Sequence, residues 1–139
     1  MVTGIILFHG NFYEDFAGFL LYIVVWLAPW FGILMTDYVL RGREYDSLSL
    51  RSSRGGLYWR NGGVHWPGVI AQIVGMAAAL MWINAAFAKP PYTGPISNHF
   101  PGLAGGDFSW AIGIIVGALV YWVLGARGVR REAAQVTSQ

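Results

Sequence analysis

Few side chains in this 139-residue sequence have the types and spacing that catalysis or metal binding requires. Cysteine is absent, which excludes thiolate nucleophiles, disulfides and cysteine-bound zinc or iron–sulfur clusters. The three histidines, His9, His65 and His99, are far apart in the sequence and lack the spacing of metal ligands. We therefore expect no catalytic residue, no metal site and no cofactor.

One carboxylate is distinguished by its position, because Asp37 directly follows a long uncharged stretch. Arg41 lies four residues further on, the helical spacing at which opposite charges form an ion pair. Two interpretations of this candidate pair are open. It is either a solvated pair at the end of a helix, or an ion pair that holds the end of this helix to another part of a larger protein.

Pro29 has a mechanical consequence, because it lies inside the same uncharged stretch. A proline within a helix donates no backbone hydrogen bond and clashes with the preceding turn, so the helix should kink or hinge there. Ala28, Gly32 and Thr36 recur at every fourth position and form a stripe of small residues that lets another helix approach closely. Pro29 and Gly32 are therefore a candidate gate or hinge, with simple helix packing as the alternative.

These residues must be positioned by membrane helices, because the composition is not that of a soluble domain. The chain is 55% hydrophobic, 16% aromatic and only 12% charged, whereas soluble domains carry about a quarter charged residues. A spanning helix needs roughly 20 mostly apolar residues. The sequence predicts an all-α membrane protein with three transmembrane helices, at about 16–40, 66–88 and 108–126. They are joined by an inner loop (41–65) and an outer loop without regular elements (89–107), and are followed by a tail (127–139).

The basic residues predict the topology. Of the nine Lys and Arg residues, five lie in the inner loop and three in the tail, which leaves Lys89 alone in the outer loop. The head, residues 1–15, contains none. The positive-inside rule then predicts a multi-pass plasma-membrane protein with its N-terminus outside and its C-terminus in the cytoplasm. Arginines that flank apolar spans fit this topology signal better than a nucleic-acid surface, so we expect no nucleic-acid partner.

Polar side chains are scarce in the middle of the predicted spans. The notable ones are Gln72 and Asn84, which are twelve positions apart and would lie on different helix faces. Each is expected to form an interhelical hydrogen bond rather than to bind a ligand. A carrier that couples to ions usually has carboxylates, hydroxyls or broken backbone at the membrane midplane. The spans of this chain therefore predict no substrate site of their own.

The aromatic residues predict which parts of the spans lie near the membrane surface. Tyr121 and Trp122, near the end of the third span, are expected to be interfacial anchors. Trp26, Trp30 and Trp82 lie deeper, and we expect them to face protein or a cavity.

Several blocks of residues in the first span stand in a distinctive order: Asn11-Phe12-Tyr13-Glu14-Asp15-Phe16, Phe19-Leu20-Leu21, Ala28-Pro29-Trp30 and Asp37-Tyr38. Their order and spacing resemble the tenth helix of the nucleobase:cation symporter-1 family, the purine, cytosine and allantoin permeases. The following Gly55-Gly56-Leu57-Tyr58-Trp59, Gly62-Gly63 and 66–75 resemble that family's inner loop and eleventh helix, and 108–125 would be the twelfth. One departure is His65, at a loop position where the family would have asparagine.

The resemblance implies the five-plus-five inverted-repeat fold of sodium symporters, of which this chain would contain helices ten to twelve. It also implies that substrate and sodium are bound mainly by the first, third, sixth and eighth helices, none of which this chain matches. The main substrate-binding site would then lie outside this chain, and its binding residues here are unknown. The outer half of the tenth helix would act as a thin gate over the substrate.

The function expected for residues 1–139 is therefore that of the C-terminal portion of a cation-coupled permease for a nucleobase, purine, cytosine or allantoin-type compound. The chain would be a truncated product or one part of a split carrier, not an enzyme, and not competent for transport alone. Its partners would be the lipid bilayer and the N-terminal part of the same carrier, with a nucleobase-like substrate and sodium or a proton bound only by the complete carrier. The alternative is a stand-alone small membrane protein with a structural or assembly role, which would pack on a partner carrier through its Gly and Ala stripes.

Overall fold

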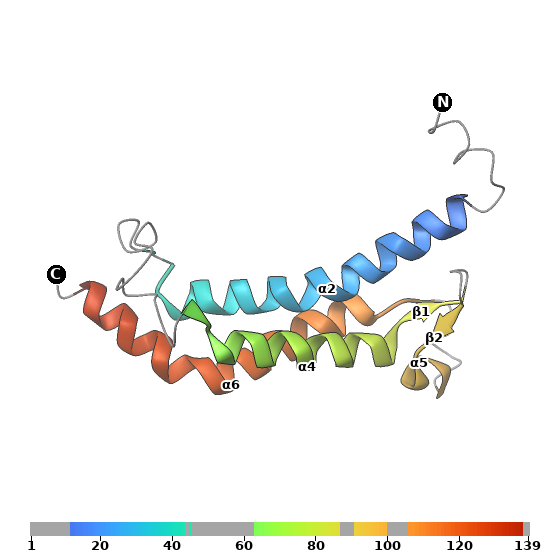
Figure 1. The fold of residues 1–139 in the computed structure, drawn as a ribbon. Coiled ribbons are helices and arrows are strands. Elements are labelled where there is room, and N and C mark those ends of the chain that lie inside the picture. The colour runs from blue at the N-terminus through green and yellow to red at the C-terminus, as the bar shows by residue number, and fades with distance from the viewer. Residues whose placement is uncertain (1–11, 44, 46–62, 87–90, 100–105, 138–139) are drawn as a thin grey trace, which may run out of the picture.

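The computed structural model describes residues 12–43, 45, 63–86, 91–99 and 106–137. Three long helices lie side by side: α2 (Phe12–Leu40), α4 (Trp66–Trp82) and α6 (Ser109–Thr137). α2 and α6 run in the same direction, and α4 runs antiparallel to both (Figure 1). Two short strands, β1 (Asn84–Ala85) and β2 (Tyr92–Thr93), and the short helix α5 (Pro95–His99) lie at one end, which we call the sheet end.

Two of the helices are long and apolar enough to cross a membrane. These are α2 over Glu14–Leu40 and α6 over Ser109–Ala134, so the prediction of a mostly helical chain with span-length apolar helices is confirmed for them. α4 is also apolar, but its 17 residues cover only about 26 Å of helix axis, whereas the hydrocarbon core is about 30 Å thick. A third membrane span therefore stays a prediction.

α4 is shorter than expected, because it ends at Trp82 and not near residue 88. Ile83 has an extended backbone, and Asn84, expected inside the helix, belongs instead to β1, which pairs antiparallel with β2. The Gly94 amide donates to the Ile83 carbonyl at 2.8 Å, and a Cβ on Gly94 would collide with the Met81 carbonyl. The chain after β1 therefore folds back closely over the end of α4. The expectation of an outer loop without regular elements was wrong for β2 and α5.

α6 is longer than the predicted third span, because it continues to Thr137. Residues 127–137, which were expected to be part of a tail after the last helix, are thus helical. Two causes are visible. This segment is rich in Arg, Glu and Ala, which favour helix, and Val129 is fully buried in a cluster with Ala71 and Tyr121.

The three helices pack through small residues, while large apolar side chains lie on the outside. Buried positions on α4 are Ala71, Gly75 and Ala79, which is the small-residue stripe of that helix. By contrast, Trp66, Ile73 and Met81 on the same helix are exposed. This inverted pattern is typical of helices that approach one another in lipid, where close backbone packing rather than apolar burial drives association.

The basic residues within the described part of the chain gather at the end opposite the sheet end. They follow α2 or lie in the last turns of α6: Arg41, Arg43, Arg127, Arg130 and Arg131. We call this end of the bundle the basic end. Because α2 and α6 run parallel, their C-terminal ends meet there, and residues far apart in the sequence come together.

Candidate functional site

Pro29 lies where the three helices cross. α2 continues through this proline, and Figure 1 shows that the helix is bent, its first half tilted relative to its second. Pro29 has no backbone N–H to donate to the carbonyl of Val25, which is the physical cause of a bend here. The Pro29 side chain is also among the most completely buried of the described residues.

Glycines of the two neighbouring helices make room for Pro29. A Cβ added to Gly75 of α4 would lie 2.6 Å from Pro29 Cβ, and one added to Gly117 of α6 would lie 2.9 Å from the Pro29 carbonyl oxygen. A Cβ on Gly113 would lie 3.1 Å from Pro29 Cδ. One turn further along α2, a Cβ on Gly32 would collide with a backbone carbonyl of α6. Both candidate gate residues, Pro29 and Gly32, therefore lie in a closely packed crossing.

Gln72 connects α4 to the bend of α2. Its side-chain Nε2 donates to the Trp26 carbonyl at 2.9 Å, three residues before Pro29, so the predicted interhelical hydrogen bond of Gln72 is confirmed. Its Oε1 is buried and has no hydrogen-bond partner among the described residues. The Gln72 side-chain amide thus supplies a hydrogen-bond donor to the Trp26 carbonyl, next to the Val25 carbonyl that has lost its donor because of Pro29.

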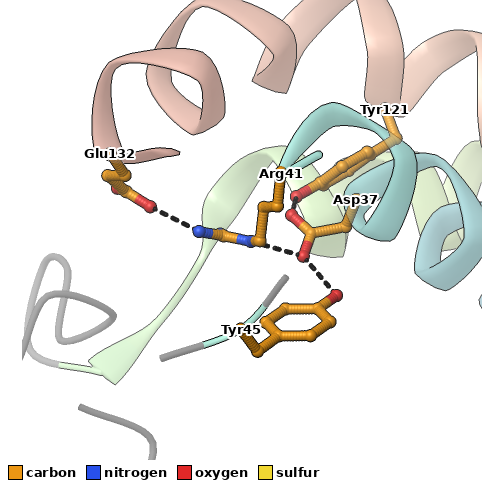
Figure 2. A network of polar contacts seen from close by, with 5 residues as sticks. All are labelled: Asp37, Arg41, Tyr45, Tyr121 and Glu132. Carbon is orange, nitrogen blue, oxygen red and sulfur yellow. Dashed lines mark hydrogen bonds and ion pairs between the residues drawn. The ribbon is translucent and has the colours of Figure 1, made fainter. Parts of the chain in front are cut away.

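The end of α2 is fixed by a glycine turn. Gly42 has φ +73°, and its amide donates to the Val39 carbonyl at 3.1 Å, while the Arg43 amide donates to the Tyr38 carbonyl at 3.0 Å. These two bonds form a Schellman motif, in which a left-handed glycine ends the helix. The turn reverses the chain and brings Tyr45 back beside the last turn of α2 (Figure 2).

Asp37 is the centre of a polar cluster at the basic end (Figure 2). Its Oδ2 accepts hydrogen bonds from Arg41 Nε at 2.8 Å and from the Tyr45 hydroxyl at 2.9 Å. Its Oδ1 accepts one from the hydroxyl of Tyr121 on α6 at 2.5 Å. Both carboxylate oxygens are therefore satisfied, and one of the three donors comes from a different helix. The structure thus places Asp37 and Arg41 in an ion pair that is itself attached to α6.

Arg41 makes a second connection to α6. Its Nη1 lies 3.2 Å from Oε2 of Glu132, and its guanidinium carbon lies 5.6 Å from the centre of the Tyr45 ring. The Arg41 side chain is only 7% exposed. Burial by itself lowers the pKa of Arg41, but its hydrogen bonds and ion pairs with Asp37 and Glu132 outweigh burial and raise that pKa above its ordinary value. Arg41 is therefore protonated and charged at every physiological pH, and the link does not vary with pH through this residue.

Sequence reasoning missed the two residues of α6 in this cluster. Tyr121 was expected to be an interfacial anchor but is only 2% exposed, with its ring edge-on to His65 at 5.5 Å. Its neighbour Trp122 is 50% exposed, as a lipid-facing anchor would be. Glu132 was expected to lie in the tail. It is an acidic residue directly after Arg130 and Arg131, and this position could have suggested that it pairs with a specific cation.

Two deep tryptophans do not pack inside this chain. Trp26 and Trp30 were expected to face protein or a cavity, yet they are 57% and 51% exposed. They are four residues apart and so share one face of α2. About half of the surface of each of these two residues is therefore not covered by this chain.

Within the described residues, the polar cluster and the crossing both hold helices together. The cluster around Asp37 uses its carboxylate as an acceptor for three donors, and the crossing at Pro29 is apolar and closely packed.

The chain is similar in sequence to known permeases. The family described as "Permease for cytosine/purines, uracil, thiamine, allantoin" matches residues 2–124. The Bacillus subtilis (strain 168) protein named "Putative purine-cytosine permease YxlA" is 31% identical over 124 residues. This match covers 88% of the chain but 25% of the relative, so the chain spans about a quarter of the relative's length. No solved structure matches the chain.

Proposed function

Because the chain belongs to the family of permeases for cytosine and purines, uracil, thiamine and allantoin, we propose that it is the C-terminal part of a membrane carrier and acts only together with the rest of it. This is a family of transporters and not of enzymes. Family membership and the two span-length helices support a membrane location. The match covers about a quarter of the relative's length, which agrees with the proposal that this chain is one part of a carrier.

The exposed face of α2 is the observation that carries this proposal. Trp26 and Trp30 lie in the middle of an apolar helix, and Phe19, two turns before Trp26 on the same side, is 59% exposed. A tryptophan indole N–H that is removed from water needs a hydrogen-bond acceptor, which a protein neighbour can supply and an acyl chain cannot. In the complete carrier, this face of α2 packs against helices that this chain lacks.

The transported compound is a nucleobase-like molecule of the cytosine, purine or allantoin type, carried with sodium or a proton. Its main binding groups lie in the missing helices. This chain contributes instead the helix beside them, α2, in the position of the gating tenth helix, and the peripheral helices α4 and α6.

Gating is assigned to the half of α2 before Pro29. The half after Pro29 is tied to α6 through Asp37 and Arg41, and the glycines of α4 and α6 fix the position of the proline itself. A change in helix direction is therefore easiest in the segment that precedes Pro29. This segment is the half of α2 nearest the sheet end.

A cysteine reporter tests the gate. The chain has no cysteine, so a single cysteine in place of Phe19 reports the exposure of this half of α2 without background in this chain. In the reassembled carrier, Pro29→Ala restores a backbone donor and should change both the transport rate and the labelling rate at position 19. If both rates are unchanged in a correctly inserted variant, Pro29 is a packing feature and the gate proposal fails.

The orientation belongs to the same proposal: the basic end faces the cytoplasm and the sheet end faces outside. The eight-to-one distribution of Lys and Arg and the gathering of the described arginines at one end support it. Reporter fusions at Ser49 and Ser97 test it, with a cytoplasmic signal expected at Ser49 alone. A cytoplasmic signal at Ser97 would invert the topology.

Reconstitution tests the main proposal. Proteoliposomes that contain this chain alone should not accumulate labelled cytosine, uracil or allantoin under a sodium or proton gradient. Vesicles that also contain the missing helices of the carrier should accumulate at least one of them. Accumulation by the chain alone, above that of empty vesicles, would overturn the proposal.

The alternative, a stand-alone membrane protein with a structural or assembly role, required the Gly and Ala stripes to be available to a partner. Ala71, Gly75 and Ala79 are buried within the chain, and Gly113 and Gly117 contact Pro29. These stripes are therefore used internally, which favours the carrier proposal over the alternative.

A further inference from the structure

A groove opens between the C-terminal turns of α2 and α6, outside the polar cluster of Asp37. Its volume is about 410 Å³, and its lining residues are Met35, Thr36, Val39, Leu40, Trp122 and Arg130. Four of these six residues are apolar or aromatic, so the groove is a mostly apolar depression on the side of the bundle. The Thr36 hydroxyl already donates to the Gly32 carbonyl at 2.8 Å, which leaves Arg130 as the charged group of the groove.

Arg130 differs from Arg41 in having no counter-ion among the described residues. Arg41 is paired with both Asp37 and Glu132, so Glu132, two residues after Arg130, is already engaged. Within the described part of the chain, the exposed Arg130 side chain forms no ion pair and no hydrogen bond. The groove therefore combines an apolar floor with an uncompensated positive charge at one end.

The position of the groove relative to the apolar part of α6 indicates what fills it. Trp122 and Arg130 are eight residues apart, about 12 Å along the helix. Trp122 lies within the apolar stretch of α6, whereas the segment from Arg127 onward is charged. The groove thus extends from the depth of acyl chains to the depth of lipid headgroups, where Trp and Arg are both favoured.

We propose that this groove binds one anionic phospholipid, with its phosphate at Arg130 and an acyl chain against Met35, Val39 and Trp122. Charge complementarity selects the headgroup. The exposed Arg127 and Arg131 flank Arg130 on α6, so a negative headgroup is attracted and the positive choline of a zwitterionic lipid is disfavoured. The apolar floor favours a lipid over free phosphate, because free phosphate has no acyl chain to pack against Val39 and Trp122. This inference uses the membrane location but not the transport proposal.

Native mass spectrometry of the purified full chain tests the lipid site, with phosphatidylglycerol and phosphatidylcholine offered at equal concentration. The wild type should retain one phosphatidylglycerol in preference to phosphatidylcholine. Arg130→Gln should reduce phosphatidylglycerol retention about five-fold, the factor expected for one arginine at a lipid surface. Retention of phosphatidylcholine should change little.

Arg131→Gln is the matched control, because it removes the same charge from the next residue, which does not line the groove. It should reduce retention much less than Arg130→Gln. Both side chains are exposed, so both variants should unfold at the wild-type temperature. Equal losses in the two variants, no preference for the anionic lipid, or equal retention of glycerol phosphate without acyl chains would each overturn the site. Failure of transport by the carrier would leave this result unaffected.

Discussion

The two halves of α2, before and after Pro29, are held by different kinds of contact. Before Pro29 the buried residues are Gly18, Val25 and Ala28, whereas in residues 30–40 the buried position is Gly32. The second half is additionally tied to α6 by Asp37 and Arg41, through the Tyr121 hydroxyl and the Glu132 carboxylate. The first half packs against α4 through apolar groups, in the cluster around Val25.

The difference shows that the energetic cost of a polar contact depends on its position along a membrane helix. A carboxylate in the middle of a span costs roughly 2.5 to 3.5 kcal/mol, whereas at the helix end it can be hydrated and paired. Asp37 occurs in the last turn of α2, where a carboxylate can be hydrated and paired. The crossing at Pro29 relies instead on close packing, with the Gln72 hydrogen bond beside it. A helix that must be fixed at one end and adjustable at the other can be built in this way.

The largest expected effect is at the crossing, which both halves share. Gly75→Val adds a side chain whose Cβ would lie 2.6 Å from Pro29 Cβ, so α4 must move away from α2. Overpacking of this kind costs about 3 kcal/mol, and we expect a clear loss of thermal stability in detergent. The control is Ala77→Val, which adds the larger side chain to an exposed position of the same helix. A stable Gly75→Val variant would mean that the crossing can adjust.

Asp37→Asn should have the next largest effect, and only on the half after Pro29. The substitution removes the charge that accepts from Arg41, Tyr45 and Tyr121. Hydrogen bonds to a charged group are worth about 1.5 to 3 kcal/mol in favourable sites. Because Asp37 is 16% exposed and solvent screens part of the interaction, we expect a cost of about 2 kcal/mol.

Hydrogen exchange separates this local effect from a general loss of stability. Exchange should increase in residues 34–43 and remain unchanged in residues 12–24. Asp15→Asn, which removes an exposed carboxylate from the other end of α2, is the control and should change neither segment markedly. An equal increase in both halves after Asp37→Asn would show that the polar cluster does not act on one half alone.

The sequence was informative where a feature depends on neighbours within one helix. The spacing of Asp37 and Arg41 and the proline inside α2 are both local patterns, and the structure has an ion pair and a bend at these places. Helix periodicity makes such contacts visible in the sequence.

Contacts between distant segments were not accessible in this way. The bond from Tyr121 to Asp37 joins residues 84 positions apart, and the contact of Arg41 with Glu132 joins residues 91 apart. Both depend on which residues of α2 and α6 face each other, which a single sequence does not specify. The early end of α4 was missed for a related reason, because it depends on the close return of Gly94 to the helix end.

A smaller effect is expected from Gln72→Leu, next to the bend. The variant loses the hydrogen bond to the Trp26 carbonyl but also removes the buried Oε1, which has no partner among the described residues. These changes oppose each other, and interhelical hydrogen bonds in membranes average about 0.6 kcal/mol, so the net loss of stability should not exceed that value. Thermal unfolding of Gln72→Leu beside Ile73→Leu, an exposed neighbour, measures it. A loss above about 2 kcal/mol would show that Gln72 holds the bend in place.

The smallest expected effect is that of Trp26→Ala in the chain alone. Substitution by alanine removes many more atoms from Trp26 than from its neighbour Val25. However, Trp26 is 57% exposed, whereas Val25 is only 3% exposed. An exposed apolar side chain in detergent or lipid exchanges one apolar surrounding for another, so its removal changes stability by less than about 0.5 kcal/mol. Val25→Ala, in contrast, opens a cavity beside Ala79 and Ile83 and should cost about 1 to 2 kcal/mol.

The same pair of variants should change rank in the complete carrier. If the face of α2 that carries Trp26 and Trp30 packs on the missing helices, Trp26→Ala then removes a buried aromatic side chain and should cost about 3 kcal/mol or more. Thermal unfolding of both variants, alone and in the assembled carrier, gives the comparison. A Trp26→Ala variant that is as stable as the wild type in both settings would place this face of α2 in lipid.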